Sequence, residues 1–116
     1  MIVHSVPKAW LDEAGVADFA PTRDAFRAIG DHVIIPIADI QPPRRSEGVV
    51  LDENGFGKDR MMKILIGIRE DHEIPPIFVE VSDGPHKFRL RGGVHRFYAS
   101  IACGFTAIPA EIVERL

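Results

Sequence analysis

The sequence KFRLRGGVHRFYASIAC, residues 87–103, changes its hydrophobic period at two adjacent glycines. Before the glycines, Lys87 to Arg91 alternates polar and apolar side chains, which is typical of a strand with one buried face. After them, apolar side chains recur at helical spacing from Val94 to Cys103, and Gly104 follows as the expected C′ residue. The expected helical stripe consists of Val94, Phe97, Tyr98, Ile101 and Ala102. The sequence therefore predicts a strand, a tight glycine turn and a helix.

Similar patterns flank this unit on both sides. A second helix is predicted over Lys58 to Glu70, with an apolar stripe at i, i+3, i+4 and i+7 formed by Met61, Ile64, Leu65 and Ile68. Strands are predicted at Val33–Ile37, Ile77–Val81 and Ile108–Val113, and a short helix from Pro21-Thr22 to Gly30. The sequence thus predicts a small α/β (α+β) domain, a mixed sheet flanked by helices, over residues 32–116. Residues 1–31 form an N-terminal lead-in.

The length, charge and composition of the chain favour some classes of protein over others. The chain has 116 residues, a net charge of −3 and a single cysteine, so it is expected to form one domain without an internal disulfide. No apolar run is long enough to span a membrane, and Met1 to Trp10 lacks the pattern of a signal peptide. These features favour a cytoplasmic protein. The net negative charge argues against a generic nucleic-acid binder, although Lys and Arg are concentrated between Arg44 and Arg96.

The glycine turn is predicted to bind an anion. Gly92 and Gly93 leave no Cβ between backbone amides and a ligand. The first N–H groups of the following helix have no intrahelical acceptor, and the helix dipole adds partial positive charge there. His95 and Arg96 follow at once, and a guanidinium can hold phosphate with two hydrogen bonds. The alternative is an ordinary strand-to-helix turn with a solvated arginine.

A family resemblance supports the anion site. Gly92-Gly93-Val94-His95-Arg96-Phe97-Tyr98-Ala99 resembles the Gly-Gly-Cys-His-Arg-Tyr-x-Ala signature of sulfiredoxin. Further similar segments occur in the same order: Val50-Leu51-Asp52-Glu53, Ile68-Arg69-Glu70-Asp71, Ile74-Pro75-Pro76-Ile77-x-Val79 and Ile108-Pro109-Ala110-x-Ile112-Val113. ParB-type partition proteins share the broader pattern, and the resemblance covers about residues 33–113. The chain is thus similar to ParB/sulfiredoxin-like domains.

The resemblance implies a nucleotide site for ATP or another nucleotide, with Mg²⁺. In sulfiredoxins the glycine turn holds the ATP phosphates, which here points to Gly92, Gly93, His95 and Arg96. Three positions on the preceding helix face the same nucleotide in that family, and they correspond to Arg60, Lys63 and Gly67 in this chain. Two of the three are cationic here. The alternative is a solvated helix face.

The resemblance breaks at the residue on which sulfiredoxin chemistry depends. That chemistry needs a thiolate directly before His-Arg, and this chain has Val94. Cys103 lies about 13 Å further along an ideal helix and near its negative end, so it is no substitute. Sulfinic acid reductase activity is not expected. Partition proteins also carry a helix-turn-helix module after this domain, and centromere binding by this chain alone is not expected.

Several functions stay open at this level. Phosphoryl transfer needs a carboxylate base, for which Asp52 and Glu53 are the candidates. Asp52, Glu53 and Asp59 are also candidates for holding Mg²⁺ on a bound nucleotide. The alternative is a ParB-like nucleic-acid-binding or nuclease-like module, in which Arg44, Arg45, Lys87, Arg89 and Arg91 track a backbone. An interaction domain for a protein or small-molecule partner is the third reading. The five scattered histidines predict no metal site of the protein's own.

Overall fold

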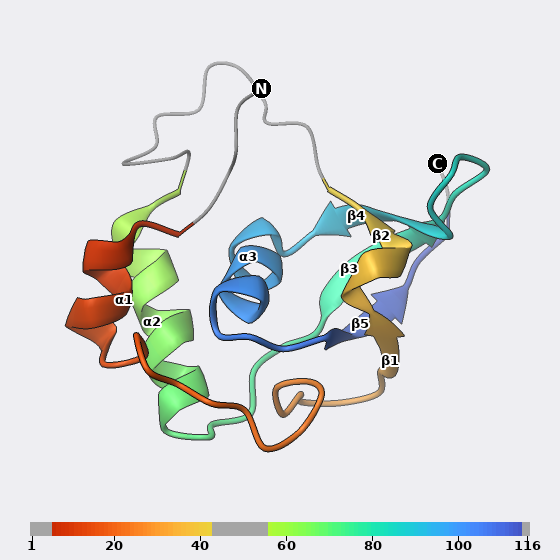
Figure 1. The fold of residues 1–116 in the computed structure, drawn as a ribbon. Helices are drawn as coiled ribbons and strands as arrows, with labels where there is room; N and C mark the ends of the chain where they lie inside the picture. The colour runs from red at the N-terminus through yellow and green to blue at the C-terminus, as the bar shows by residue number, and fades with distance from the viewer. Residues whose placement is uncertain (1–5, 43–55, 115–116) are drawn as a thin grey trace.

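The computed structural model describes residues 6–42 and 56–114. Three α-helices and a 3-10 turn occur in this part of the chain: α1 (Lys8–Ala14), η1 (Ile37–Asp39), α2 (Lys58–Arg69) and α3 (Val94–Ala102). The strands are β1 (Val33–Pro36), β2 (Ile40–Gln41), β3 (Ile77–Val81), β4 (Phe88–Gly92) and β5 (Ala107–Ile112). Figure 1 shows their arrangement.

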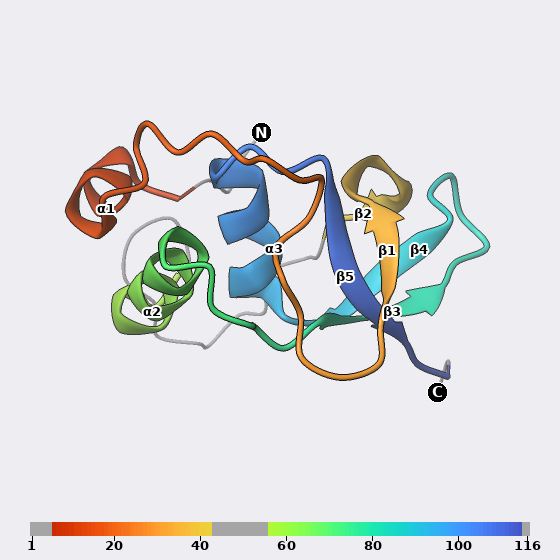
Figure 2. The ribbon, with the colours of Figure 1, turned by 90° about the horizontal axis from the view of Figure 1, so that it is seen from below.

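The strands form one mixed sheet in the order β1-β5-β3-β4-β2. β3 and β4 form an antiparallel hairpin, whereas β5 returns parallel to β3 and antiparallel to β1. A parallel return needs a crossover connection, and α3 provides it. Figure 2 shows that α3 lies directly against the sheet, with α2 outside α3 and α1 outermost. The glycine turn therefore lies where the central hairpin enters the helical layer.

The hydrophobic core lies between the sheet and the helices. The strand residues Ile77, Val79 and Ile108 are fully buried, and Met61 and Leu65 of α2 are fully buried as well. Burying one such side chain contributes roughly 1.5–3 kcal/mol. The core fixes the positions of α2 and α3 relative to the sheet, and with them the positions of both helix N-termini.

Most predicted elements are confirmed. α2 begins at the predicted Lys58, α3 begins at the predicted Val94, and β3 has the predicted bounds. Gly104 is left-handed, with φ 88°, directly after the C-cap of α3. The α/β class with a mixed sheet is therefore confirmed.

The predicted short helix between Pro21 and Gly30 is wrong. This segment consists of bends and turns, and its backbone groups bond to distant parts of the chain. Ile29 N–H donates to Ile74 O at 3.1 Å, and Thr106 N–H donates to Asp24 O at 3.1 Å. These long-range bonds take the place of the helical ones that the sequence pattern indicated.

The predicted stripe of α3 is wrong at Ile101, which is 46% exposed. Ala99 and Ser100 are fully buried instead. Because α3 lies between the sheet and α2, it is buried around most of its circumference, and small residues allow the close packing on both sides.

The lead-in shares the core of the domain. Val6, Trp10, Ala14 and Val16 belong to the same cluster of buried residues as the sheet and α2. Arg69 of α2 donates to Ala14 O at 2.8 Å, which holds the end of α1 against α2. In the described ranges 6–42 and 56–114, no helix has the length and apolar character needed to cross a membrane.

Candidate anion-binding site

The turn between β4 and α3 requires glycine. Gly93 is the N-cap of α3, with φ 92° and ψ 35° in the left-handed region. A Cβ at this position would lie 2.8 Å from Ile77 Cγ2, closer than side chains tolerate. Gly93 O accepts the first helical hydrogen bond from Phe97 N–H at 2.9 Å. The N-terminus of α3 thus starts from a tight turn that has no capping side chain.

The N-terminus of α2 lies beside that of α3. Its N-cap is also a glycine, Gly57, and Gly57 N–H donates to His95 Nε2 at 2.9 Å. The ring of Phe56 packs edge-on against both His95 and Tyr98. In Figure 1 both helices begin at the upper end of the molecule and run downward. The N-termini of α2 and α3 both have a glycine N-cap, and both carry the partial positive charge of a helix dipole. The hydrogen bond from Gly57 to His95 therefore links these two ends. No local sequence pattern indicates this pairing, because His95 and Gly57 are 38 residues apart.

Arg96 braces the turn. Its Nη1 donates to the carbonyl oxygens of Pro75 at 2.9 Å and Pro76 at 2.7 Å. A Cβ on Gly93 would lie 3.1 Å from Arg96 Nη2, which places the guanidinium directly behind the turn. Burial lowers the pKa of Arg96 below its ordinary value. Arg96 thus links α3 to the segment that enters β3, a role that the sequence did not indicate.

The two cations predicted on α2 are accessible. Arg60 and Lys63 are exposed, and neither forms an ion pair or hydrogen bond with the residues that the structure describes. Gly67, the third predicted position, is buried instead, and a Cβ there would lie 3.5 Å from Ile74 Cδ1. Asp59 is exposed in the first turn of α2. The candidate bases Asp52 and Glu53 lie outside the described residues, as do Arg44 and Arg45.

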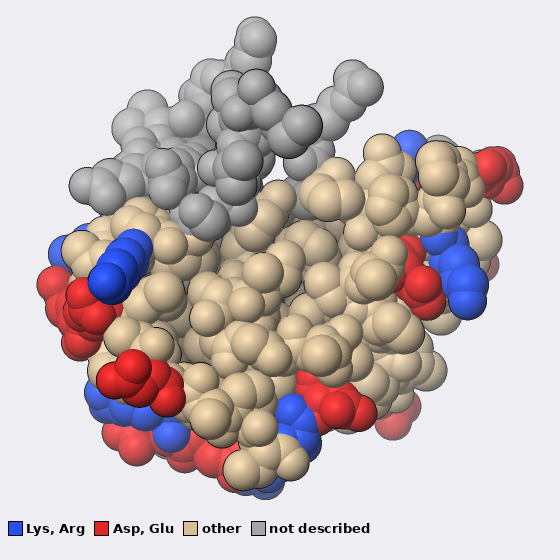
Figure 3. Space-filling view, in the orientation of Figure 1, with Lys and Arg blue, Asp and Glu red and all other residues tan. Residues whose placement is uncertain are grey.

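The face shown in Figure 3 carries no broad basic surface. Its charged side chains lie mainly around the edge, and the centre, over α3, carries neither sign of charge. This side of the molecule therefore offers no extended basic surface to a polyanion.

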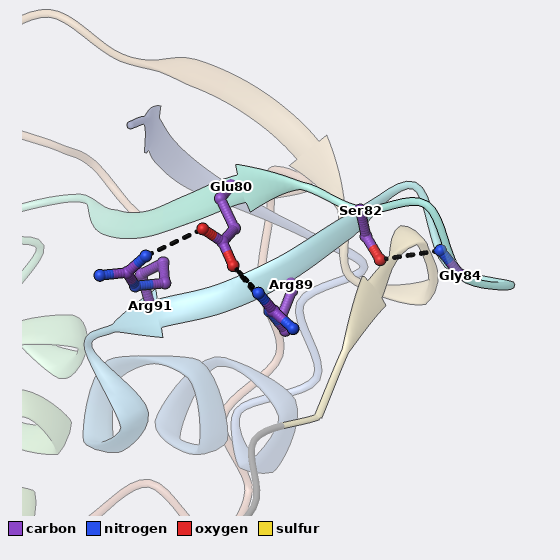
Figure 4. Close-up of polar contacts among 5 residues, drawn as sticks. All are labelled: Glu80, Ser82, Gly84, Arg89 and Arg91. Carbon is purple, nitrogen blue, oxygen red and sulfur yellow. Dashed lines mark hydrogen bonds and ion pairs between the residues drawn. The ribbon is translucent and has the colours of Figure 1, made fainter. Parts of the chain in front are cut away.

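The cations of β4 have carboxylate partners. Figure 4 shows Arg89 and Arg91 on either side of Glu80, which projects from β3 and is fully buried. Arg89 Nε donates to Glu80 Oε1 at 2.7 Å, and Arg91 Nη1 donates to Oε2 at 2.8 Å. Lys87 Nζ lies 3.7 Å from Asp39 Oδ2. Of the row predicted to track a nucleic-acid backbone, the three cations that the structure describes therefore share two carboxylates, Glu80 and Asp39.

The Glu80 cluster makes stability depend on pH. The hydrogen bond from Arg89 lowers the pKa of Glu80; burial opposes this, and Arg91 adds to the lowering. A carboxylate whose folded pKa is depressed stabilises the fold above its unfolded pKa. That contribution is lost as the pH falls below about 4.5 and through the folded value. We expect Glu80→Gln to flatten the acid limb of a urea-unfolding series that runs from neutral to acid pH. An acid limb as steep as that of the wild-type protein would contradict this role.

Comparison with known proteins gives no match to a family model or to a curated protein sequence. The fold is similar to that of two solved structures. One is the C-terminally truncated chromosome-partitioning protein ParB from Caulobacter crescentus complexed with CTP-γ-S, with a TM-score of 0.57 and 20% identity. The other is sulfiredoxin from Arabidopsis thaliana, with a TM-score of 0.55 and 22% identity. The similarity covers 75% of this chain with ParB and 74% with sulfiredoxin. The fold is ParB/sulfiredoxin-like.

The two similarities differ in extent. This chain matches 88% of the sulfiredoxin chain but 46% of the ParB chain. The chain therefore spans less than half the length of that ParB. The ParB/sulfiredoxin-like fold confirms the expectation drawn from the ordered motifs between residues 33 and 113.

Within this ParB/sulfiredoxin-like fold, the one cysteine is far from reactive. Cys103 is 2% exposed, and burial raises the pKa of its thiol to about 11. It follows the C-terminal end of α3, whereas the glycine turn lies at the N-terminal end. A thiolate is the nucleophilic form of cysteine, and almost none is present at neutral pH with this pKa.

We therefore expect Cys103 to resist an aromatic disulfide reagent in the native state at pH 8. In urea the reaction should be complete within the mixing time of a standard assay, because the unfolded thiol has an ordinary pKa near 8.5. The absorbance of the released thiolate measures both rates. A native rate equal to the unfolded rate would contradict the burial of Cys103.

Proposed function

We propose that this chain is a nucleotide-binding domain that holds the phosphates of a nucleoside triphosphate at the start of α3. The observation that carries the proposal is the meeting of two glycine-capped helix N-termini through the hydrogen bond from Gly57 N–H to His95 Nε2. Helix N-termini favour anions through their N–H groups and dipoles, and two together favour a polyanion such as a triphosphate.

Each residue has a distinct part in this proposal. Gly92 and Gly93 let the backbone approach the phosphates, and His95 positions the start of α2 beside the turn. Arg96 braces the turn through the carbonyls of Pro75 and Pro76 and adds a cation within the first turn of α3. Arg60 and Lys63 supply exposed cations for the outer phosphates.

The ligand class follows from the chemistry and is supported by the comparison. The similar ParB was crystallised with CTP-γ-S, a nucleoside triphosphate analogue. Mg²⁺ fits such a ligand because it takes most of its oxygens from phosphate and water. Among residues 6–42 and 56–114, no group of three or more metal-binding side chains occurs. Any Mg²⁺ would therefore be held through the nucleotide and one or two carboxylates.

The residues of the chain also bear on the reaction that follows nucleotide binding. Val94 and the buried Cys103 leave no thiolate for sulfinic acid reduction, so we expect no such activity. Phosphoryl transfer to a small molecule, with Asp52 or Glu53 as the base, is the reaction that the residues support best.

Calorimetric titration tests the binding. ATP, CTP, GTP and UTP are titrated with Mg²⁺ into the wild-type chain and into the double variant Arg60→Ala/Lys63→Ala. We expect at least one triphosphate to bind, and the double variant to bind it about tenfold more weakly, because two exposed ion pairs contribute up to about 1 kcal/mol each. Melting temperatures of both proteins should agree, since both cations are exposed.

Lys8→Ala is the matched control, because Lys8 is an exposed cation on α1. It should leave the affinity unchanged. Absence of binding for all four triphosphates would overturn the proposal. Binding of a DNA duplex with a steep salt dependence, in place of triphosphates, would support the nucleic-acid alternative.

A further inference from the structure

A pocket lies at the opposite end of α2 from the glycine turn. It has a volume of about 210 Å³, and it is formed by the lead-in, the end of α2 and Phe105, which lies between α3 and β5. Figure 1 shows the orange lead-in passing the lower end of α2. Since α2 has 12 residues, the two sites are separated by about 18 Å along the helix. This pocket is independent of the proposed nucleotide site.

The floor of the pocket is aromatic. Phe19, Phe26 and Phe105 line it, and the rings of Phe19 and Phe105 are tilted, with centroids 5.9 Å apart. Tilted aromatic rings present both faces and edges to a third ring, which is the arrangement that aromatic side chains favour. The floor therefore suits a flat apolar group of about one ring in size.

The rim of the pocket is basic. Arg23 and Arg27 line it, and their side chains are 50% and 44% exposed. Both contact the same carboxylate oxygen, Asp71 Oδ2, at 3.5 Å, well beyond the roughly 2.7–2.9 Å of a strong charged hydrogen bond. Arg27 Nη1 also donates a hydrogen bond to the backbone oxygen of Asp71 at 3.0 Å. Arg27 Nη2 also lies 3.9 Å from Glu73 Oε1, a carboxylate that is not among the pocket lining. Of the side chains that line the pocket, Arg23, Arg27 and Arg69 carry positive charge and Asp71 carries negative charge, so the lining itself has more cations than carboxylates.

We propose that this pocket binds a small aromatic anion, with its ring on the three phenylalanines and its anionic group at Arg23 and Arg27. The pocket is smaller than the roughly 300–1,000 Å³ of drug-sized sites, so the ligand has one ring and one short anionic substituent. Asp71 lines the same rim, and it limits the site to a ligand with a single anionic group.

Benzoate is the probe, with benzamide as the uncharged molecule of the same shape and acetate as the anion without a ring. In an amide-resolved NMR titration, benzoate should shift the signals of residues 19–27, 68–72 and 105 and bind in the millimolar range, as expected for a fragment of this size. Benzamide and acetate should bind at least about fivefold more weakly. Equal binding of benzoate and benzamide, or shifts by benzoate that exclude these residues, would overturn the proposal.

Arg23→Ala tests the rim without removing a strong contact, because the one contact given for Arg23 is the long one to Asp71. The variant should keep the wild-type melting temperature and lose about fivefold in benzoate affinity. Lys8→Ala is the control and should bind benzoate like the wild-type chain. Unchanged benzoate affinity in Arg23→Ala would overturn the role of the rim.

Discussion

Gly93→Ala is expected to lower the free energy of unfolding by about 3 kcal/mol, from the strain of a left-handed non-glycine residue and from overpacking. The backbone of Gly93 has φ 92°, and a Cβ would meet Ile77 Cγ2 at 2.8 Å. Ile77 is fully buried in β3, so it has little room to move away. Urea unfolding followed by circular dichroism measures the change.

Gly30→Ala is the matched control for this effect. Gly30 has a similar φ of 75°, but a Cβ there would meet no atom within 4 Å. Gly30→Ala therefore isolates the strain of a left-handed backbone and should lower the free energy of unfolding by about 1–2 kcal/mol. If the two variants lost equal stability, the tight contact between the turn and β3 would be contradicted.

Arg96→Ala is expected to lower the free energy of unfolding by about 2–3 kcal/mol, because it removes charged hydrogen bonds to two carbonyl groups. Pro76 is buried, so its carbonyl would lose a partner that water replaces poorly. Arg96→Lys should recover part of the loss, since an ammonium keeps the charge but lacks the planar fork. Chemical denaturation of the three proteins gives the comparison.

Arg60→Ala separates bracing from ligand binding. Arg60 is exposed, so its removal should change stability by less than about 0.5 kcal/mol while it weakens triphosphate binding. If Arg96→Ala were as stable as Arg60→Ala, Arg96 would act on the ligand alone, as its place in the glycine turn indicated from sequence.

The regular elements could be predicted because their hydrophobic periods are clear. Lys58 to Arg69 and Val94 to Ala102 have helical spacing, and Ile77 to Val81 lies between turn signals. The segment from Pro21 to Gly30 could not be predicted in this way. Its hydrogen bonds go to Ile74, Thr106 and Ala107, which are distant in sequence. A local pattern carries no information on such partners.

The elements that carry the candidate site could be predicted, but the contacts among its residues could not. The glycine turn and the cations Arg60 and Lys63 follow from local spacing and from the resemblance to sulfiredoxin. The acceptors of Arg96 and the bond from Gly57 to His95 depend on how α2 and β3 pack around α3. Similarly, the pairing of Glu80 with Arg89 depends on the register between β3 and β4, which a single strand does not reveal.

The most direct measurement is an amide-resolved NMR titration of the wild-type chain with Mg²⁺ and the triphosphate that binds best. A phosphate at two helix N-termini should shift the amide signals of Gly93, Val94 and His95 most, together with those at the start of α2. Residues 19–27, at the other end of α2, should stay unchanged. Saturable binding that leaves the amides of Gly93 to His95 unshifted would contradict the phosphate site at the glycine turn.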